Sequence, residues 1–147
     1  MLKLNDSIIR KRVSSGLVKG NILRTNLFTK KNNKPQFERI ILLNNNFNQE
    51  DIYYVMTTSR VKWYKRNWNR MKYCSLFIEK GTIDIFKKAT VINCREVNKL
   101  TKQNLIDRYM ENMLEFLGVL PEDILKKVLK CLVGSRLIKS KILKEII

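Results

Sequence analysis

The sequence contains no histidine, only two prolines and only three cysteines among its 147 residues. The absence of histidine excludes Ser-His-Asp and Cys-His catalysis, and any ribonuclease mechanism that uses a pair of histidines. The cysteines, Cys74, Cys94 and Cys131, are odd in number and widely spaced, so we expect reduced thiols rather than a disulfide framework. No two of them have zinc-ligand spacing, and we expect neither a metal nor a cofactor.

Long hydrophobic runs are also missing. No apolar run approaches the about 20 residues that span a bilayer, and the segment from Met1 to Asp6 has no apolar core of signal-peptide length. We therefore expect a cytoplasmic protein that does not enter the membrane. Hydrophobic residues still make up 44% of the chain, which predicts one globular domain with a real core.

Acidic residues are scarce. The formal net charge is +17, from 30 Lys and Arg against 13 Asp and Glu, and no acid occurs from Ile52 to Ile78. Such an excess of one sign causes self-repulsion in the folded state, which a polyanionic partner would relieve. Nucleic acid, an anionic membrane surface or an acidic protein would each serve.

Within the acid-free segment, six cations alternate with aromatic residues from Arg60 to Lys72. Cations neutralise phosphates and aromatic rings stack on unpaired bases, so this pattern indicates a surface for single-stranded nucleic acid. The alternative is a solvated basic edge strand that discourages aggregation. The residues predicted to contact RNA in this segment are Arg60, Lys62, Trp63, Lys65, Arg66, Trp68 and Arg70.

Strand patterns come first in the chain and helix patterns last. After a short N-terminal helix, the predicted strands cover 17–27, 37–43, 52–58, 73–78 and 89–94, with a polar loop over 29–36. Predicted helices run from Thr101 to Gly118, onward from Pro121 to an interruption at Gly134, and over 138–147. We expect a single domain with an N-terminal extension (1–15), a twisted antiparallel sheet or partly open barrel (16–100), and C-terminal helices (101–147).

Several segments resemble, in order and spacing, the MazF/PemK family of toxin ribonucleases from bacterial toxin–antitoxin systems. They are Lys19-Gly20-Asn21-Ile22-Leu23, Glu38-Arg39-Ile40-Ile41-Leu42-Leu43, Thr57-Thr58-Ser59-Arg60, the strand and its continuation over 89–100, and Leu117-Gly118-Val119-Leu120. Two residues depart from the family pattern: Asn21 replaces an Asp, and Ile40 replaces a Pro. The basic segment over 63–71 has no clear counterpart in the family.

The resemblance implies a mainly β, SH3-like barrel with two to three C-terminal helices. It also implies a homodimer, an acidic antitoxin as partner, and metal-independent cleavage of single-stranded RNA. The family's catalytic Arg and Thr correspond to Arg39 and Thr58, with Thr57 as the substitute if the register slips by one. Lys19 and Lys34 are further predicted RNA contacts.

In such a reaction the neighbouring 2′-hydroxyl attacks the phosphorus, and the products are a 2′,3′-cyclic phosphate and a 5′-hydroxyl. A guanidinium matches two phosphate oxygens, so Arg39 is expected to stabilise the transition state and protonate the leaving 5′-oxygen. Two other functions fit the residues. One is a catalytically silent, SH3-like module that binds RNA or DNA, and the other is an adaptor for an acidic protein.

Overall fold

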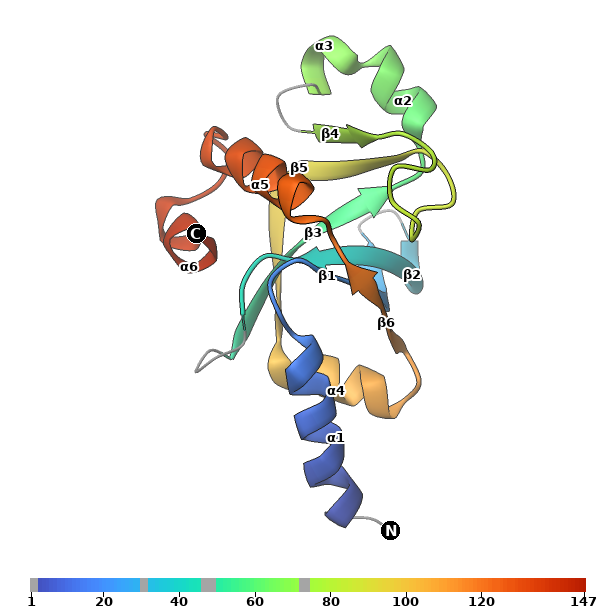
Figure 1. Ribbon diagram of the computed structural model, residues 1–147, viewed down its shortest axis with the longest axis vertical. Helices are drawn as coiled ribbons and strands as arrows, with labels where there is room; N and C mark the ends of the chain where they lie inside the picture. The colour runs from blue at the N-terminus through green and yellow to red at the C-terminus, as the bar shows by residue number, and fades with distance from the viewer. Residues whose placement is uncertain (1–2, 30–31, 46–49, 72–74) are drawn as a thin grey trace.

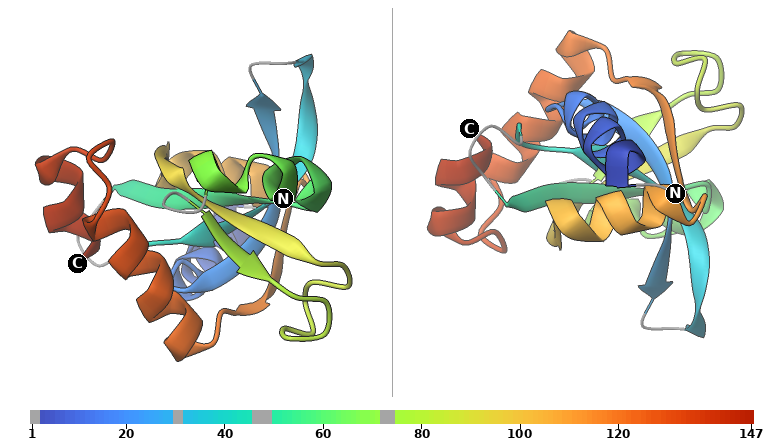
Figure 2. Two further views of the ribbon diagram at one scale, coloured as in Figure 1. Left: turned by 90° about the horizontal axis from the view of Figure 1, so that it is seen from above. Right: turned by 90° about the horizontal axis from the view of Figure 1, so that it is seen from below.

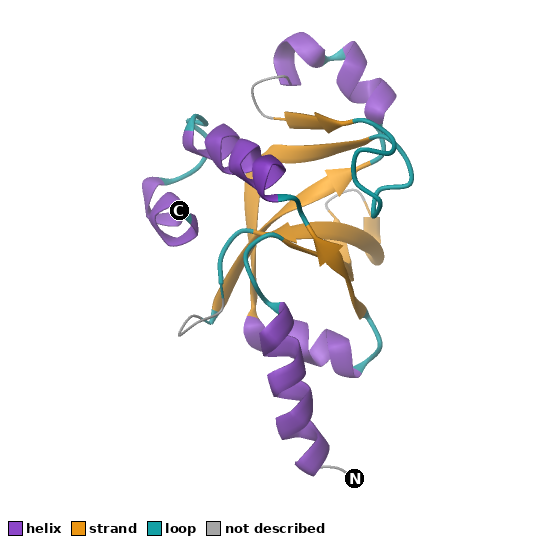
Figure 3. Cartoon of the chain, viewed as in Figure 1, coloured by secondary structure: helices purple, strands orange, loops and turns teal. Residues whose placement is uncertain are grey.

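Six strands form one antiparallel sheet in the order β4-β5-β3-β2-β1-β6 (Figures 1 and 3). The computed structural model describes residues 3–29, 32–45, 50–71 and 75–147. Neighbouring strands are hydrogen-bonded along the whole order, and the sheet is not closed into a barrel. The strands are β1 (Asn21–Thr29), β2 (Asn32–Leu42), β3 (Asp51–Thr58), β4 (Ser75–Ile78), β5 (Thr90–Thr101) and β6 (Leu114–Val119).

Helices cover both faces of the sheet, and each face has its own core. On one side Val128 and Leu132 of α5 and Ile146 of α6 pack on Ile41 and Val55; we call this the α5 face. On the other side Val13 of α1 and Leu105 of α4 belong to a second cluster, and we call this the α4 face. The helices are α1 (Lys3–Gly16), α2 (Val61–Arg66), α3 (Trp68–Met71), α4 (Lys102–Met110), α5 (Glu122–Val133) and α6 (Ser140–Ile146).

The two covered faces explain the continuous apolar run in β2. Ile40, Ile41 and Leu42 are all fully buried. Successive side chains of a strand point to opposite faces, and accordingly Ile41 packs on the α5 face while Ile40 and Leu42 pack on the α4 face. The N-terminal half of β2 forms a hairpin with β1, and this hairpin projects beyond the rest of the sheet (Figure 2).

The helix predicted from Thr101 to Gly118 is wrong in its second half. Thr101 does cap a helix, through a capping box with Asn104, but that helix ends at Met110. Asn112 then adopts a positive φ of 59°, and the chain returns as β6 to pair with β1. The apolar positions of this segment satisfied a helical period, yet they pack as a strand because the sheet edge beside β1 supplies hydrogen-bond partners.

Three other boundaries also differ from the sequence prediction. The predicted loop over 29–36 is largely strand, because β2 begins at Asn32 and pairs with the end of β1. The strand predicted to end at Cys94 continues to Thr101 as β5. The basic segment forms the helices α2 and α3 rather than an edge strand.

The remaining predicted elements are confirmed where the structure describes them; residues 73 and 74 of the strand predicted over 73–78 lie outside the described residues. The confirmed elements include the N-terminal helix, the helix after Pro121 with its end at Gly134, and the short terminal helix. The predicted class, a mainly β fold with a twisted antiparallel sheet and helices, is also confirmed. Within the described residues no helix is long and apolar enough to cross a bilayer.

Candidate functional site

Arg39 and Thr57 meet where the β2–β3 ladder ends. The outermost register pair of this ladder is Ile40 opposite Met56, so the next position outward brings Arg39 opposite Thr57. The Thr57 hydroxyl donates a hydrogen bond to the Arg39 carbonyl oxygen over 3.2 Å. Thr57 is buried and the Arg39 side chain is exposed. The structure therefore brings together two of the three predicted catalytic residues, and it favours Thr57 over Thr58 as the partner of Arg39.

A second arginine lies beside Arg39. Arg24 on β1 is its direct register partner, and residues opposite each other in an antiparallel ladder share a face. Because Arg39 is two residues from Ile41, this face is the α5 face. We call Arg24 and Arg39 the arginine pair. The Arg24 guanidinium also lies 4.2 Å from the ring centre of Phe37 and 4.0 Å from the Glu115 carboxylate.

The arginine pair and Thr57 form a group suited to an anion. Each guanidinium presents a planar set of donors that matches two oxygens of a phosphate. The Thr57 hydroxyl fixes the strand end that carries Arg39, because it donates a hydrogen bond to the Arg39 carbonyl oxygen. Its oxygen keeps lone pairs that can accept a further hydrogen bond. This arrangement can hold a phosphate group and stabilise added negative charge on it.

Thr58 belongs to the opposite, α4 face. Its hydroxyl accepts a hydrogen bond from the Arg60 backbone N–H over 3.2 Å, which turns the chain out of β3 and into α2. Glu38 shares this face, since it alternates with Arg39. Burial raises the pKa of the Glu38 carboxyl, and the nearby charge of Arg60 lowers it in part. Arg60 therefore lies at the sheet end, close to Thr58 and Glu38 of the α4 face.

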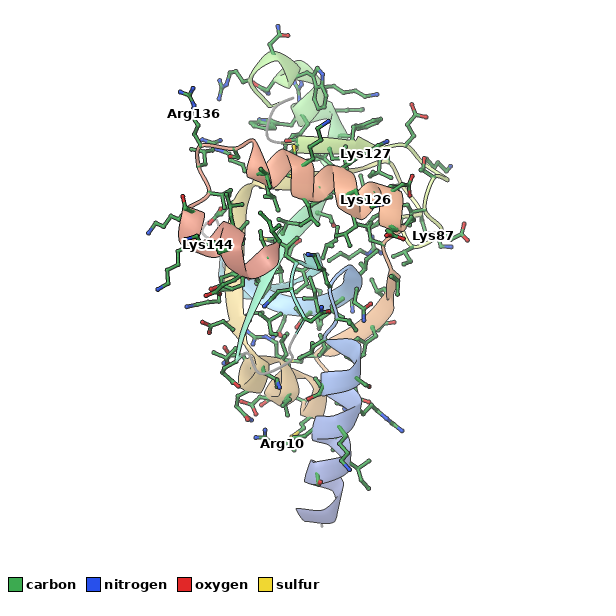
Figure 4. The ribbon with its side chains drawn as sticks, turned by 60° about the vertical axis from the view of Figure 1, so that its left-hand side comes forward. Arg10, Lys87, Lys126, Lys127, Arg136 and Lys144 are labelled. Carbon is green, nitrogen blue, oxygen red and sulfur yellow. The ribbon has the colours of Figure 1, made fainter. Side chains whose placement is uncertain are left out.

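The cations predicted to contact RNA on α2 and α3 are exposed as expected of a binding surface, and so are both tryptophans, Trp63 and Trp68. The charge is not confined to this segment. Figure 4 shows Lys126, Lys127 and Arg136 pointing away from the body on and after α5. The exposed cations of the segment are Arg60, Lys62, Lys65, Arg66 and Arg70.

Two predicted RNA contacts lie apart from this group. The Lys19 amine donates to the carbonyl oxygen of Ile146, at the end of α6, over 2.5 Å, and burial lowers its pKa. Lys19 thus bonds with the C-terminal helix rather than with the arginine pair. Lys34 falls within β2, but its side chain lies outside the described ones. Both contacts stay predictions.

The two departures from the family pattern have structural explanations. The Asn21 side-chain amide donates to the carbonyl oxygen of Gly16, the last residue of α1, over 2.5 Å. A carboxylate at this position has no proton to donate, so Asn21 suits a chain with an N-terminal helix. Ile40 is fully buried on the α4 face, where its side chain joins the core. Neither departure changes Arg24 or Arg39.

Sequence reasoning missed Arg24 and Glu38. Arg24 lies in a strand pattern with no motif around it, and only the β1–β2 register brings it to Arg39. Glu38 adjoins Arg39 in the sequence, which was a usable signal, but its partial burial depends on tertiary packing. In the described part of the chain, no group of three or more His, Cys, Asp and Glu residues is arranged to hold a metal.

The fold has a counterpart among solved structures. A chain of the crystal structure of MazE-MazF (Form-III) from Deinococcus radiodurans matches with a TM-score of 0.51 and 16% sequence identity, over 78% of this chain and 91% of that chain. No protein-family model matches the sequence, and no curated protein does. At this level of identity the likeness establishes the fold alone, and the chain has a MazF-like fold.

Proposed function

We propose that this chain is the toxin of a toxin–antitoxin system and an endoribonuclease that cleaves single-stranded RNA. The observation that carries the proposal is the group formed by Arg24, Arg39 and Thr57, at one end of a MazF-like sheet. The net charge of +17 supports a polyanionic substrate. The exposed cations and tryptophans of α2 and α3 supply further contacts with the RNA strand.

The proposed reaction uses a nucleophile that belongs to the substrate. The ribose 2′-oxygen forms a bond to phosphorus while its proton leaves to a base, and the bond from phosphorus to the 5′-oxygen breaks. The products are a 2′,3′-cyclic phosphate and a 5′-hydroxyl. Arg39 and Arg24 bind the non-bridging oxygens as negative charge grows on them. Arg39 donates the proton that the 5′-oxygen takes up and regains one from water, which serves as the base for the 2′-hydroxyl proton.

The proposed partners follow from the same charge and fold. The matched neighbour comes from a MazE-MazF structure, so we propose an acidic antitoxin that covers the arginine pair and excludes RNA from it. We also propose that the active toxin is a homodimer. Co-purification with the product of an adjacent small reading frame, followed by mass measurement of the complex under native conditions, tests both.

The decisive experiment is cleavage of a mixed-sequence RNA in EDTA by the purified protein and its variants. Arg39→Ala and Arg24→Ala should each reduce cleavage, by about 100-fold or more for Arg39, because one donor to a developing oxyanion contributes roughly 3 kcal/mol in other enzymes. Arg136→Ala is the matched control, since Arg136 is an exposed arginine outside the group. End-group analysis should find cyclic phosphates.

Two results would contradict the proposal. Cleavage that survives Arg39→Ala undiminished would show that the arginine pair is not the active site. Strong, salt-sensitive RNA binding by the unaltered protein with no cleavage in any buffer would instead show a catalytically silent binding module.

A further inference from the structure

A pocket on the other side of the sheet end lies between the helices α2 and α3 and the strand β4. It is lined by Tyr64, Lys65, Trp68 and Phe77 and has a volume of ≈ 280 Å³. Three of its four walls are aromatic, and the Lys65 amine lies 5.1 Å from the centre of the Phe77 ring. The sequence pattern of β4 suggests that Phe77 is core, but here it is only partly buried.

The strand register relates this pocket to the arginine pair. Phe77 is opposite Val91 on β5, and Val91 is opposite Thr58 on β3. The pocket is therefore on the face of Thr58, whereas Arg39 and Thr57 occupy the reverse side of the same sheet end. Arg60, bonded through its N–H to the Thr58 hydroxyl, lies at the sheet end on the same side as the pocket. Burial raises the pKa of the Tyr64 phenol, and the nearby charges of Arg95 and Arg60 lower it in part.

We propose that the Tyr64–Phe77 pocket binds one unpaired base of the single-stranded nucleic acid whose scissile phosphate lies at the arginine pair, so that it acts as a specificity subsite. The strand would pass from the α5 face around Arg60 to the α4 face. This role in cleavage rests on the function proposed above, whereas the binding of a base does not.

Size and charge both favour a base as the occupant. At ≈ 280 Å³ the pocket is just below the range typical of drug-sized ligands, which suits one flat ring system. Stacking of a base on an aromatic ring contributes strongly to single-strand binding and is tolerant of sequence. Arg66 and Arg70 in the same segment are exposed, and no acid occurs from Ile52 to Ile78. The phosphates of a bound strand therefore meet positive charge without nearby repulsion.

The position of Lys65 argues against an apolar peptide side chain as the occupant. Its ammonium is part of the pocket wall, over the Phe77 ring. An apolar anchor would take this ammonium out of water without giving it a partner, which is unfavourable. A nucleotide carries a phosphate as well as a base. Its phosphate can pair with the Lys65 ammonium while its base stacks on the aromatic rings.

The test separates base binding from cleavage. A fluorescein-labelled DNA oligonucleotide of mixed sequence has no 2′-hydroxyl to attack and is compared with an abasic oligonucleotide of the same length, by fluorescence anisotropy. We expect the intact strand to bind about tenfold or more tightly than the abasic strand. Trp68→Ala should abolish most of this difference and leave the affinity for the abasic strand unchanged.

Met110→Ala is the control. Met110 is an exposed apolar side chain at the end of α4, at 48% against 37% for Trp68, and it does not line the pocket. Because both are exposed, neither change should unfold the protein, which circular dichroism will verify. Retention of the base-dependent difference in Met110→Ala and its loss in Trp68→Ala supports the pocket.

Equal binding of intact and abasic strands would overturn the proposal, as would equal effects of Trp68→Ala and Met110→Ala. Displacement of the oligonucleotide by an acidic peptide, with the same loss in Trp68→Ala and no dependence on bases, would identify a peptide site instead. If base-dependent binding is found but the unaltered protein cleaves no RNA, the proposed function fails and the base site stands. If RNA is cleaved, Trp68→Ala should change which sequences are cut.

Discussion

Arg24 and Arg39 lie directly opposite each other on neighbouring antiparallel strands, and both project from the α5 face of the sheet. Like charges in this relationship destabilise a sheet by roughly 0.2–1 kcal/mol. Glu115 lies 4.0 Å from Arg24, but both side chains are largely exposed, and such pairs contribute little. The arginine pair is therefore suited to binding an anion from solution, and it does not stabilise the free protein.

Arg39→Ala should therefore stabilise the protein, whereas it should remove the proposed RNA cleavage. We expect the free energy of unfolding to rise by up to about 1 kcal/mol at low ionic strength, and the gain to disappear in high salt, where surface charges are screened. Urea unfolding at low and at high salt measures this. Arg136→Ala, as the control, should show no such gain. A loss of stability in Arg39→Ala would mean that Arg39 serves the fold.

The sequence was sufficient for the elements whose patterns have one physical solution. The buried run of Ile40, Ile41 and Leu42 has to be a strand between two covered faces, and the apolar positions after Pro121 fit only a helix. Residues 114–119 have no such single solution, since Leu114, Phe116 and Leu117 fit a helical period as well as a strand. The open edge of β1 decides between them, and a local pattern does not contain that information.

The same limit applies to the candidate site. The resemblance predicted Arg39 with Thr58, and Thr57 only as the substitute, because it gives an order along the chain; which threonine shares a face with Arg39 depends on the register between β2 and β3. Arg24 could not be predicted, since its role depends on the register between β1 and β2. The α2–α3 segment was predicted as a binding surface from its composition, but its pocket depends on how Tyr64 and Trp68 pack against Phe77.

Asn21→Asp should destabilise the protein even though Asp is the residue typical of the MazF/PemK pattern that the sequence resembles. The new carboxylate cannot donate to the Gly16 carbonyl, and it places a negative charge at the C-terminal end of α1. We expect the free energy of unfolding to fall by about 1–3 kcal/mol at neutral pH. The loss should shrink at a pH below about 4, where a protonated Asp can donate. Asn21→Ala, which removes the bond without adding charge, should be less harmful at neutral pH.

Gly118→Ala should be more damaging than Gly81→Ala. Both glycines have a positive φ, 151° and 87°, so any side chain strains the backbone by roughly 1–2 kcal/mol. A Cβ at Gly118 would also lie 2.5 Å from Cδ1 of Ile85, whereas nothing lies within 4 Å of one at Gly81. Overpacking of this kind adds about 1–3 kcal/mol. Thermal unfolding of the two variants measures the difference, and equal losses would contradict the packing of Ile85 against β6.

Tyr53→Phe should weaken the attachment of α6 in a manner that depends on pH. A hydrogen bond to Glu145 is the largest of the effects that raise the pKa of Tyr53 to about 12. Between pH 10 and 12 the folded protein therefore binds more protons than the unfolded chain, so stability falls as the pH rises. The contribution is complete below pH 10, where Tyr53→Phe should lose about 1 kcal/mol. Chemical unfolding from pH 8 to 11.5 should show the two proteins converging, and Tyr109→Phe serves as the control.

Glu38→Gln should stabilise the protein at neutral pH and leave it unchanged in acid. Burial raises the pKa of Glu38 above 4.5, against a smaller opposite effect of Arg60. Since the folded state holds this proton more tightly, stability falls as the pH rises from 4.5 through the folded pKa. Gln has nearly the same shape and no charge, so it avoids that loss. The advantage of the variant should be absent well below pH 4.5 and constant above the folded pKa, as measured by urea unfolding across this range.

The control for this prediction is Glu111→Gln, at an exposed position after α4, which should show no comparable advantage. If Glu38→Gln is instead less stable than the unaltered protein at pH 7, the attraction between Glu38 and Arg60 outweighs the burial of the carboxylate. Arg60 would then be held at the sheet end by Glu38. In that case Glu38→Gln should also weaken RNA binding, because Arg60 would no longer be fixed at the sheet end beside the Tyr64–Phe77 pocket.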